Sequence, residues 1–182
     1  MTSWKQKLPW QRLLPSKPKF QRALDLCPPD KVKVVIVGDR LYEQHNGLAF
    51  STHPKAGFEA SHHIIFKEYR RDLGFDLPRT GDLTSWAEQG VLLLPSEENK
   101  LFTFCLLRYL STNHPHIVYL LWGAKAERFN PAIEQGRVFV ASLPSPLNIS
   151  YGNDTFTGCS HFSEANRYLE EHGIKPVNWK LR

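Results

Sequence analysis

The six residues Val32-Lys33-Val34-Val35-Ile36-Val37 decide the fold class of this chain. Five of them are valine or isoleucine, whose β-branched side chains favour strands. Polar and apolar residues do not alternate here, as they would in a strand with one solvated face. Runs of the same kind occupy residues 90–94, 117–122 and 137–142. Such runs indicate strands that are buried on both faces, as in a parallel sheet.

Helical patterns separate these runs. Residues 60–72 and 97–111 carry apolar side chains at helical spacing, namely Ile64, Ile65, Phe66 and Tyr69 in the first and Leu101, Phe104, Cys105, Leu107 and Leu110 in the second. Asp82 and Thr84 can cap a short helix that runs through residue 89, and a last helix is expected from near Ser163 to Gly173. The alternation predicts an α/β fold, a three-layer α/β/α sandwich around a central four-stranded parallel sheet.

Ligands of such sheets bind beyond the carboxyl ends of the strands. We therefore expect residues 38–47, 95–99, 123–127 and 143–148 to converge on one site. Trp86 and Trp122 are expected in the core, and His53, His62 and His63 on the surface.

Composition bounds the remaining possibilities. The 182 residues, 41% of them hydrophobic, suit one globular domain with a core of its own. No apolar run reaches 18 residues, and the first residues do not resemble a signal peptide. Cys27, Cys105 and Cys159 lack metal-ligand spacing. We expect a cytoplasmic protein with reduced thiols, no metal, no cofactor and no membrane contact.

The positive charge lies at one end of the chain. Residues 1–22 contain six basic residues and no acid, whereas residues 23–182 contain 17 basic and 18 acidic residues. We expect a basic N-terminal arm, residues 1–22, followed by a single domain, residues 23–182. The arm, which also carries Trp4, Trp10 and Phe20, suits a segment that lies on phosphates. A leader whose aromatic side chains pack on the body is an equal alternative.

A stiff loop is predicted after the last strand, with the sequence Leu143-Pro144-Ser145-Pro146-Leu147-Asn148. Its two prolines fix an extended backbone with few amide donors. Ser145 can hold a phosphate, and Leu147 is an apolar tip of the kind that wedges into a base stack. A proline-rich surface turn is the alternative.

Several segments in this order resemble the uracil-DNA glycosylase superfamily, its family 1 enzymes above all. They have the sequences VVIVG (34–38), GLAFS (47–51), DLTSWAEQGVLLL (82–94), LLWG (120–123), PSPL (144–147), GCSHFS (158–163) and KPVNWK (175–180). The resemblance implies a monomer that binds double-stranded DNA, flips a nucleotide and hydrolyses its glycosidic bond. It places Phe50 under the flipped base, Leu147 in the vacated stack, and Ser61, Gly123 and the Pro144-Ser145-Pro146 loop at the DNA backbone.

The departures from the family pattern fall where the chemistry occurs. Arg40 stands in the column of the catalytic aspartate, with Asp39 one residue earlier and the loop about three residues shorter than in the family. Pro95 replaces the uracil-reading asparagine, and the segment after it is about a dozen residues shorter. Leu143 replaces the histidine that stabilises the leaving base. Because proline and leucine side chains cannot form those hydrogen bonds, excision of uracil by the standard mechanism is not expected.

Two explanations compete. In the first, the chain excises another base, a bulky modified cytosine such as the glucosylated hydroxymethylcytosine of phage DNA, as antiphage members of the superfamily do. Asp39 or Glu43 would position water, Arg40 would hold a phosphate or a sugar hydroxyl, and His45, which also faces DNA, or a buried Glu43 would protonate the leaving base. Tyr42 counts against this, because its family counterpart blocks ring substituents. In the second, the chain is an inactive scaffold that binds DNA or a protein. Weak residual excision of uracil is a third option.

Overall fold

The computed structural model describes residue 8 and residues 11–14, 21–38, 43–141 and 156–181. Its sheet contains β1 (Val34–Gly38), β2 (Val91–Pro95), β3 (Val118–Trp122) and β4 (Arg137–Ala141). All neighbouring strands are parallel, in the order β2-β1-β3-β4. The predicted four-stranded parallel sheet is confirmed.

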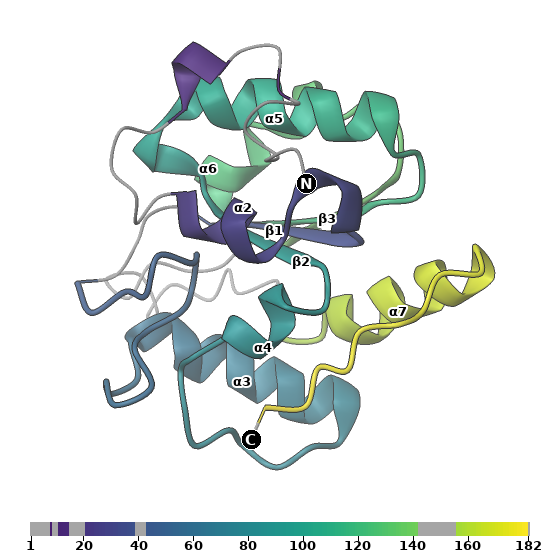
Figure 1. The fold of residues 1–182 in the computed structure, drawn as a ribbon. Coiled ribbons are helices and arrows are strands. Elements are labelled where there is room, and N and C mark those ends of the chain that lie inside the picture. The colour runs from purple at the N-terminus through teal and green to yellow at the C-terminus, as the bar shows by residue number, and fades with distance from the viewer. Residues whose placement is uncertain (1–7, 9–10, 15–20, 39–42, 142–155, 182) are drawn as a thin grey trace.

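Helices cover both faces of the sheet (Figure 1). The helices α2 (Arg22–Leu26), α5 (Lys100–Asn113) and α6 (Ala124–Glu127) lie on one face. The helices α3 (Ala60–Leu73), α4 (Thr84–Ala87) and α7 (His161–Glu171) lie on the other. Short 3-10 turns at Gln11–Leu13, Pro29–Lys31, Ser96–Glu98 and Asn130–Ala132 complete the described elements. The arrangement is the predicted three-layer sandwich.

Burial differs between the strands. Every residue of β1, β2 and β3 is buried, as their apolar runs predict. The prediction was wrong for β4, in which only Ala141 is buried and Val140 is 43% exposed. β2 and β4 both lie at edges of the sheet, but α2 and α4 pack against β2, whereas no described helix packs as closely on β4.

Two helices begin at other residues than predicted. The segment expected to be helical from residue 97 first forms the 3-10 turn Ser96–Glu98, and α5 starts at Lys100 after the Asn99 side chain caps the Phe102 amide. Of the residues assigned to its apolar face, Leu107 and Leu110 are buried as predicted, whereas Leu101 and Phe104 are 58% and 40% exposed. Phe102 and Leu106, which were not assigned to that face, are buried. The last helix starts at His161, two residues before Ser163, directly after Ser160 with its left-handed φ of 55°.

Aromatic side chains close the face of the sheet that α3, α4 and α7 cover. The rings of Tyr69, Trp86, Phe162 and Trp179 pack edge to face or stacked, with centroids 5.1 to 6.5 Å apart. Trp86 Nε1 donates to the Trp179 carbonyl at 2.8 Å, which ties the C-terminal segment to α4. The core positions predicted for Trp86 and Trp122 are confirmed by exposures of 0% and 1%.

The described part of residues 1–22 packs on the body. Leu8 is buried in the core, and Leu13 accepts a hydrogen bond from Asn99 Nδ2 at 2.9 Å. All three cysteines are free. Among the described residues, no helix combines the length and the apolar character needed to cross a bilayer.

Candidate active site at the carboxyl ends of the strands

Three strands end side by side at one edge of the sheet. Gly38 at the end of β1 pairs in register with Pro95 at the end of β2, and β3 ends at Trp122 on the other side of β1. The segments predicted to converge on a site follow these ends. Several predicted site residues lie outside the described residues, namely Asp39, Arg40, Tyr42, Leu143, Pro144, Ser145, Pro146 and Leu147.

Phe50 lies against the end of β1. A Cβ atom at Gly38 would lie 2.8 Å from Phe50 Cε2, so glycine is required for the ring to approach the strand. On its other side the ring contacts Trp122, with centroids 5.5 Å apart. Phe50 itself has a left-handed φ of 58°, which is unusual for a residue with a side chain. The surrounding structure must hold this conformation in place.

His62 is one residue that holds the backbone of Phe50. Its Nε2 lies 2.8 Å from the Phe50 carbonyl oxygen, and its Nδ1 accepts a hydrogen bond from the Glu59 amide at 2.9 Å. The ring is fully buried and stacks on Phe66 at 5.2 Å between centroids. Burial lowers the pKa of His62, an effect that the hydrogen bond to Phe50 opposes and the nearby His63 reinforces. The prediction that His62 is a surface residue was wrong, whereas His53 and His63 are exposed as expected.

A second set of polar contacts supports the same loop. Ser51 Oγ accepts from the Leu83 amide at 2.9 Å, and the Thr52 amide donates to the Gly81 carbonyl at 3.0 Å. Asn46 Nδ2 donates to Asp82 Oδ1 at 2.8 Å. Asp82 also accepts from the Thr84 amide, which starts α4 as its sequence predicts. The loop that contains Phe50 is therefore hydrogen-bonded both to α3 and to the segment that leads into α4.

The start of α3 carries Ser61, the predicted phosphate contact. Ser61 is the second residue of this helix and is 8% exposed. Glu59 caps the helix in a reciprocal arrangement, in which its side chain accepts from the His62 amide and the His62 ring accepts from the Glu59 amide. Ser61 and Phe50 are thus linked through a single neighbouring side chain.

The end of β2 presents no amide side chain to the site. Pro95 is buried, and Ser96 Oγ donates to the Gly38 carbonyl at 2.7 Å, which closes β2 onto β1. The nearest asparagine, Asn99, uses its oxygen for the Phe102 amide and its nitrogen for the Leu13 carbonyl. Only four residues, 96–99, separate β2 from α5.

The end of β3 has a different construction. Gly123 adopts a left-handed φ of 97°, and its amide donates to Ala141 at the end of β4 at 2.9 Å. Trp122 Nε1 donates to His161 Nδ1 at 3.0 Å, and the Trp122 ring packs on Phe156 at 4.9 Å. Burial lowers the pKa of His161 to about 4, so the ring is neutral and can accept this hydrogen bond.

A buried carboxylate fixes the segment before α7. Glu68 on α3 is fully buried and accepts hydrogen bonds from Arg71 and from the amides of Gly158 and Ser160. Burial raises the pKa of this carboxyl, but the hydrogen bonds outweigh it and leave the pKa below its usual value. Burial also raises the pKa of Cys159 to about 12, so this thiol is no nucleophile at neutral pH.

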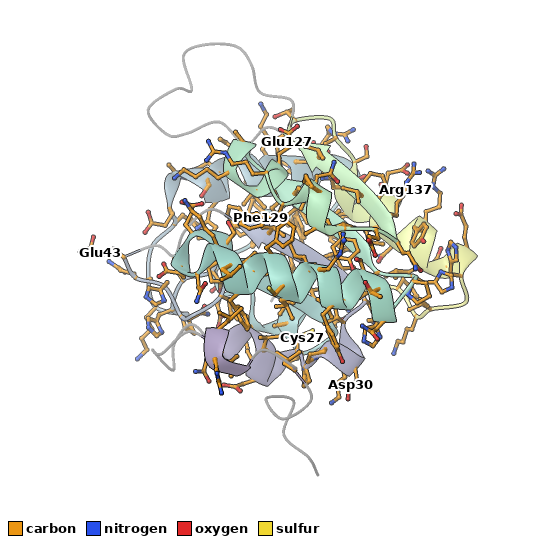
Figure 2. The ribbon with its side chains drawn as sticks, turned by 90° about the horizontal axis from the view of Figure 1, so that it is seen from above. Cys27, Asp30, Glu43, Glu127, Phe129 and Arg137 are labelled. Carbon is orange, nitrogen blue, oxygen red and sulfur yellow. The ribbon has the colours of Figure 1, made fainter. Side chains whose placement is uncertain are left out.

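Two predicted polar residues lie on the loop before Phe50. Glu43 is exposed and extends away from the body of the protein (Figure 2), so the burial that would make it a general acid is missing. His45 is half-buried, accepts the Gly47 amide at 3.0 Å through Nδ1, and pairs with Thr52 across an antiparallel bridge. Among the described residues, no three histidine, cysteine or acidic side chains gather as metal ligands would.

The sequence did not predict the roles of three residues that shape this site: His62, Ser96 and Glu68. Their contacts join segments far apart in the chain, such as Glu68 with Ser160, 92 residues later. A capping pattern at Glu59 and His62 is the one local signal that was available.

Solved structures share this fold. A mimivirus uracil-DNA glycosylase matches with a TM-score of 0.81 and 24% identity over 89% of this chain and 72% of that one. A wild-type UNG from Nitratifractor salsuginis matches with a TM-score of 0.52 and 15% identity over 83% of this chain and 78% of that one. A comparison with models of known protein families gives no match.

Relatives with similar sequences identify the family. A uracil-DNA glycosylase of Acinetobacter baumannii (strain AYE) is 40% identical over 197 aligned positions, which cover 98% of this chain and 82% of the relative. One of Pseudomonas fluorescens (strain Pf-5) is 38% identical over 190 positions, 94% of this chain and 81% of the relative. The fold and these relatives define an enzyme of the DNA glycosylase class, a hydrolase of N-glycosyl bonds. Within this class, the chain belongs to the uracil-DNA glycosylase family.

The alignment also bears on the shortened loops. Its 197 positions exceed the 182 residues of the chain, so at least 15 positions of the A. baumannii relative fall opposite gaps in this chain. The comparison does not locate these gaps, so the shortenings inferred after Gly38 and after Pro95 stay predictions.

Proposed function

We propose that this chain flips and hydrolytically excises a pyrimidine other than uracil, a bulky modified cytosine, and leaves an abasic site in double-stranded DNA. The candidate base is the α-glucosyl-hydroxymethylcytosine of phage DNA, and the biological role is antiviral defence in the cytoplasm. The observation that carries the proposal is the end of β2, where Pro95 stands in the uracil-reading column and, among the described residues 91–99, no amide side chain takes its place.

The hydrogen bonds around Pro95 support this argument. Asn99 is committed to Phe102 and Leu13, and Ser96 to Gly38, so neither is available to read the edge of a base. A site that reads uracil uses a paired donor and acceptor, and its loss removes a large part of the discrimination between bases. The connection from β2 to α5 has only four residues, so little of the chain is available to enclose a base beside the end of β2. A short connection favours a base with a large substituent.

The parts that handle DNA independently of the base support a retained enzyme. Phe50 lies at the sheet edge beside Gly38, as a stacking platform would, and Ser61 and Gly123 lie at the starts of α3 and α6. Unstacking a nucleotide costs a few kcal/mol, which an apolar wedge such as Leu147 offsets in part. Backbone contacts would come from Ser61, Gly123, His45 and the Pro144-Ser145-Pro146 segment, and the basic residues 1–22 would add phosphate affinity.

The chemistry is assigned to the loop after β1. Asp39 would position the water and stabilise positive charge on the sugar, and Arg40 would hold a phosphate or a sugar hydroxyl. The exposure of Glu43 favours Asp39 over Glu43 for this role. Tyr42, Phe50, Pro95 and Leu143 would line the base pocket of a monomeric enzyme that needs no cofactor.

Uracil is the second candidate substrate. The relatives that are 38–40% identical over most of their length are named uracil-DNA glycosylases, which favours uracil for any member of the family. The chain would then need to bind uracil without the amide group at Pro95.

Four duplexes that differ at one position separate these possibilities. They carry glucosylated hydroxymethylcytosine, hydroxymethylcytosine, cytosine or uracil, and alkali-induced strand cleavage reports base loss after treatment with enzyme. We expect cleavage of the glucosylated duplex, none of the cytosine duplex, and little of the uracil duplex.

Cleavage of the uracil duplex alone would replace the proposed substrate with uracil. If no duplex is cleaved at high enzyme excess while DNA is still bound in a salt-dependent manner, the chain is a binding scaffold and the proposal is wrong.

A further inference from the structure

His62 connects two parts of the site that act on different parts of the DNA. One ring nitrogen contacts the Phe50 carbonyl, behind the stacking platform, and the other contacts the Glu59 amide, at the start of the helix that carries Ser61. The ring is fully buried and stacked on Phe66, with the two ring planes 2° apart, so it has little freedom to turn.

The contacts determine where the proton of the ring lies. A backbone amide can only donate, so Nδ1 must accept from Glu59 and carries no proton. A neutral imidazole then carries its proton on Nε2, which donates to the Phe50 carbonyl. A second proton on Nδ1 would face the Glu59 amide proton and break the helix cap. The geometry therefore selects one tautomer of the neutral ring.

Phe50 needs such a partner. Its left-handed φ of 58° is strained for a residue with a side chain, and such a conformation persists only where neighbouring contacts fix it. The ring must also stay against Gly38, where a Cβ atom would lie 2.8 Å away. The hydrogen bond to its carbonyl acts at the residue that is strained.

We propose that His62 is a positioning residue, which through its Nε2 proton holds Phe50 in the orientation that stacks a flipped base, and through Nδ1 holds the start of α3. This inference deepens the proposed function and rests on it for the role of Phe50. It makes two separable predictions. Loss of the Nε2 contact impairs the step that follows base flipping, and loss of the Nδ1 contact impairs DNA binding at α3.

Two variants test the contacts of the two ring nitrogens of His62 separately. His62→Asn places an amide oxygen near the position of Nδ1 and keeps the cap, but cannot reach Phe50. His62→Gln can extend an amide N–H to the Phe50 carbonyl. His63→Asn is the matched control, because His63 is the next residue of the helix and is exposed.

The variants are compared by steady-state and single-turnover kinetics, with whichever of the four duplexes the wild-type enzyme cleaves as the substrate. We expect His62→Asn to lower kcat by about tenfold with little change in KM, because one net hydrogen bond at the platform is lost. His62→Gln should restore kcat to within about threefold of the wild type, and His63→Asn should change neither constant. Equal kcat for His62→Asn and wild type, or equal loss in His62→Asn and His62→Gln, would overturn the proposal.

A double-mutant cycle with Phe50→Leu tests whether His62 acts through the aromatic ring. If it does, His62→Asn should have little further effect on kcat once the ring is gone. Fully additive effects would mean that His62 only stabilises the fold. Thermal unfolding of each variant shows whether it is folded at the assay temperature.

The tautomer can be tested without any substrate. Heteronuclear NMR of isotope-labelled histidine in the intact protein should show His62 protonated at Nε2 and not at Nδ1. Protonation at Nδ1 would contradict the inference whatever the activity of the enzyme. If the NMR result holds but no duplex loses a base, the proposed function fails and the assignment of the hydrogen bonds stands.

Discussion

The strands β2 and β3 flank β1 and end at the same edge of the sheet, yet their ends have different chemistry. The end of β3 relies on backbone geometry, with Gly123 in a left-handed conformation and its amide bonded to Ala141. At the end of β2, by contrast, Pro95 has no side chain that can form a hydrogen bond, and the Ser96 hydroxyl donates to the Gly38 carbonyl. Backbone geometry survives most substitutions nearby, whereas recognition by one side chain is lost when that side chain changes. Within a family, base recognition can therefore change while the contacts to the DNA backbone are retained.

The largest expected effect comes from Asp39, in the segment that follows β1 in the sequence. We expect Asp39→Asn to reduce base release by about 10³-fold, because it removes the carboxylate assigned to the water, while DNA affinity stays within about twofold. Single-turnover cleavage and equilibrium binding measure the two quantities. Asp76→Asn, a change at an exposed acid between α3 and α4, is the control and should alter neither. Full activity of Asp39→Asn would remove Asp39 from the mechanism.

The next effect concerns stability on the β3 side. Burial holds the pKa of His161 at about 4, below the usual 6.5. The unfolded chain therefore binds a proton between pH 6.5 and 4 that the folded protein does not bind, and stability falls as pH is lowered through this range. The shift corresponds to a loss of up to about 3 kcal/mol. Urea unfolding at several pH values measures it.

His161→Asn is the comparison for this measurement, since its amide oxygen can still accept from Trp122 but does not titrate. Its stability should depend less on pH between 6.5 and 4 than that of the wild type. Identical pH profiles for the two proteins would show that His161 is not buried in its neutral form.

A smaller loss of stability is expected at Gly123. A side chain at a φ of 97° is strained, and Gly123→Ala should cost about 1–3 kcal/mol of unfolding free energy. Gly57→Ala is the matched control, because a Cβ atom there meets nothing within 4 Å and φ is not left-handed. It should change the unfolding free energy by less than about 1 kcal/mol. Chemical denaturation distinguishes the two, and equal costs would mean that the turn after β3 does not depend on glycine.

The smallest effect tests the β2 end. Pro95→Asn restores an amide in the uracil-reading column, and we expect the ratio of uracil excision to excision of the modified base to rise by about tenfold. Competition between the two duplexes in one reaction measures this ratio directly. An unchanged ratio would mean that Pro95 does not face the base.

The sequence predicts the fold wherever the signal is a property of single segments. Residues 34–37 and 117–122 are apolar throughout because their strands are buried on both faces, and the sheet follows from four runs of this kind. β4 belongs to a run of the same kind, but no described helix packs on it as closely as α2 and α4 pack on β2, and neither composition nor periodicity reports which strand the helices cover. The start of α5 was misplaced because the 3-10 turn Ser96–Glu98 precedes the cap at Asn99.

The site could be predicted in part. Phe50 and Pro95 were identified from segments that match a family, and the structure places both at the sheet edge. His62 was misjudged because a histidine between polar neighbours suggests a surface position. Its burial depends on Phe50, 12 residues away, and on Phe66, and only the folded chain brings these side chains together.

The identity of the base that is released is the most direct test of this account. Mass spectrometry of the products after treatment of phage DNA that contains glucosylated hydroxymethylcytosine, and of uracil-containing DNA, measures it. The account predicts the glucosylated base in the first sample and little or no free uracil in the second. Free uracil alone, or no released base from either DNA, would contradict it.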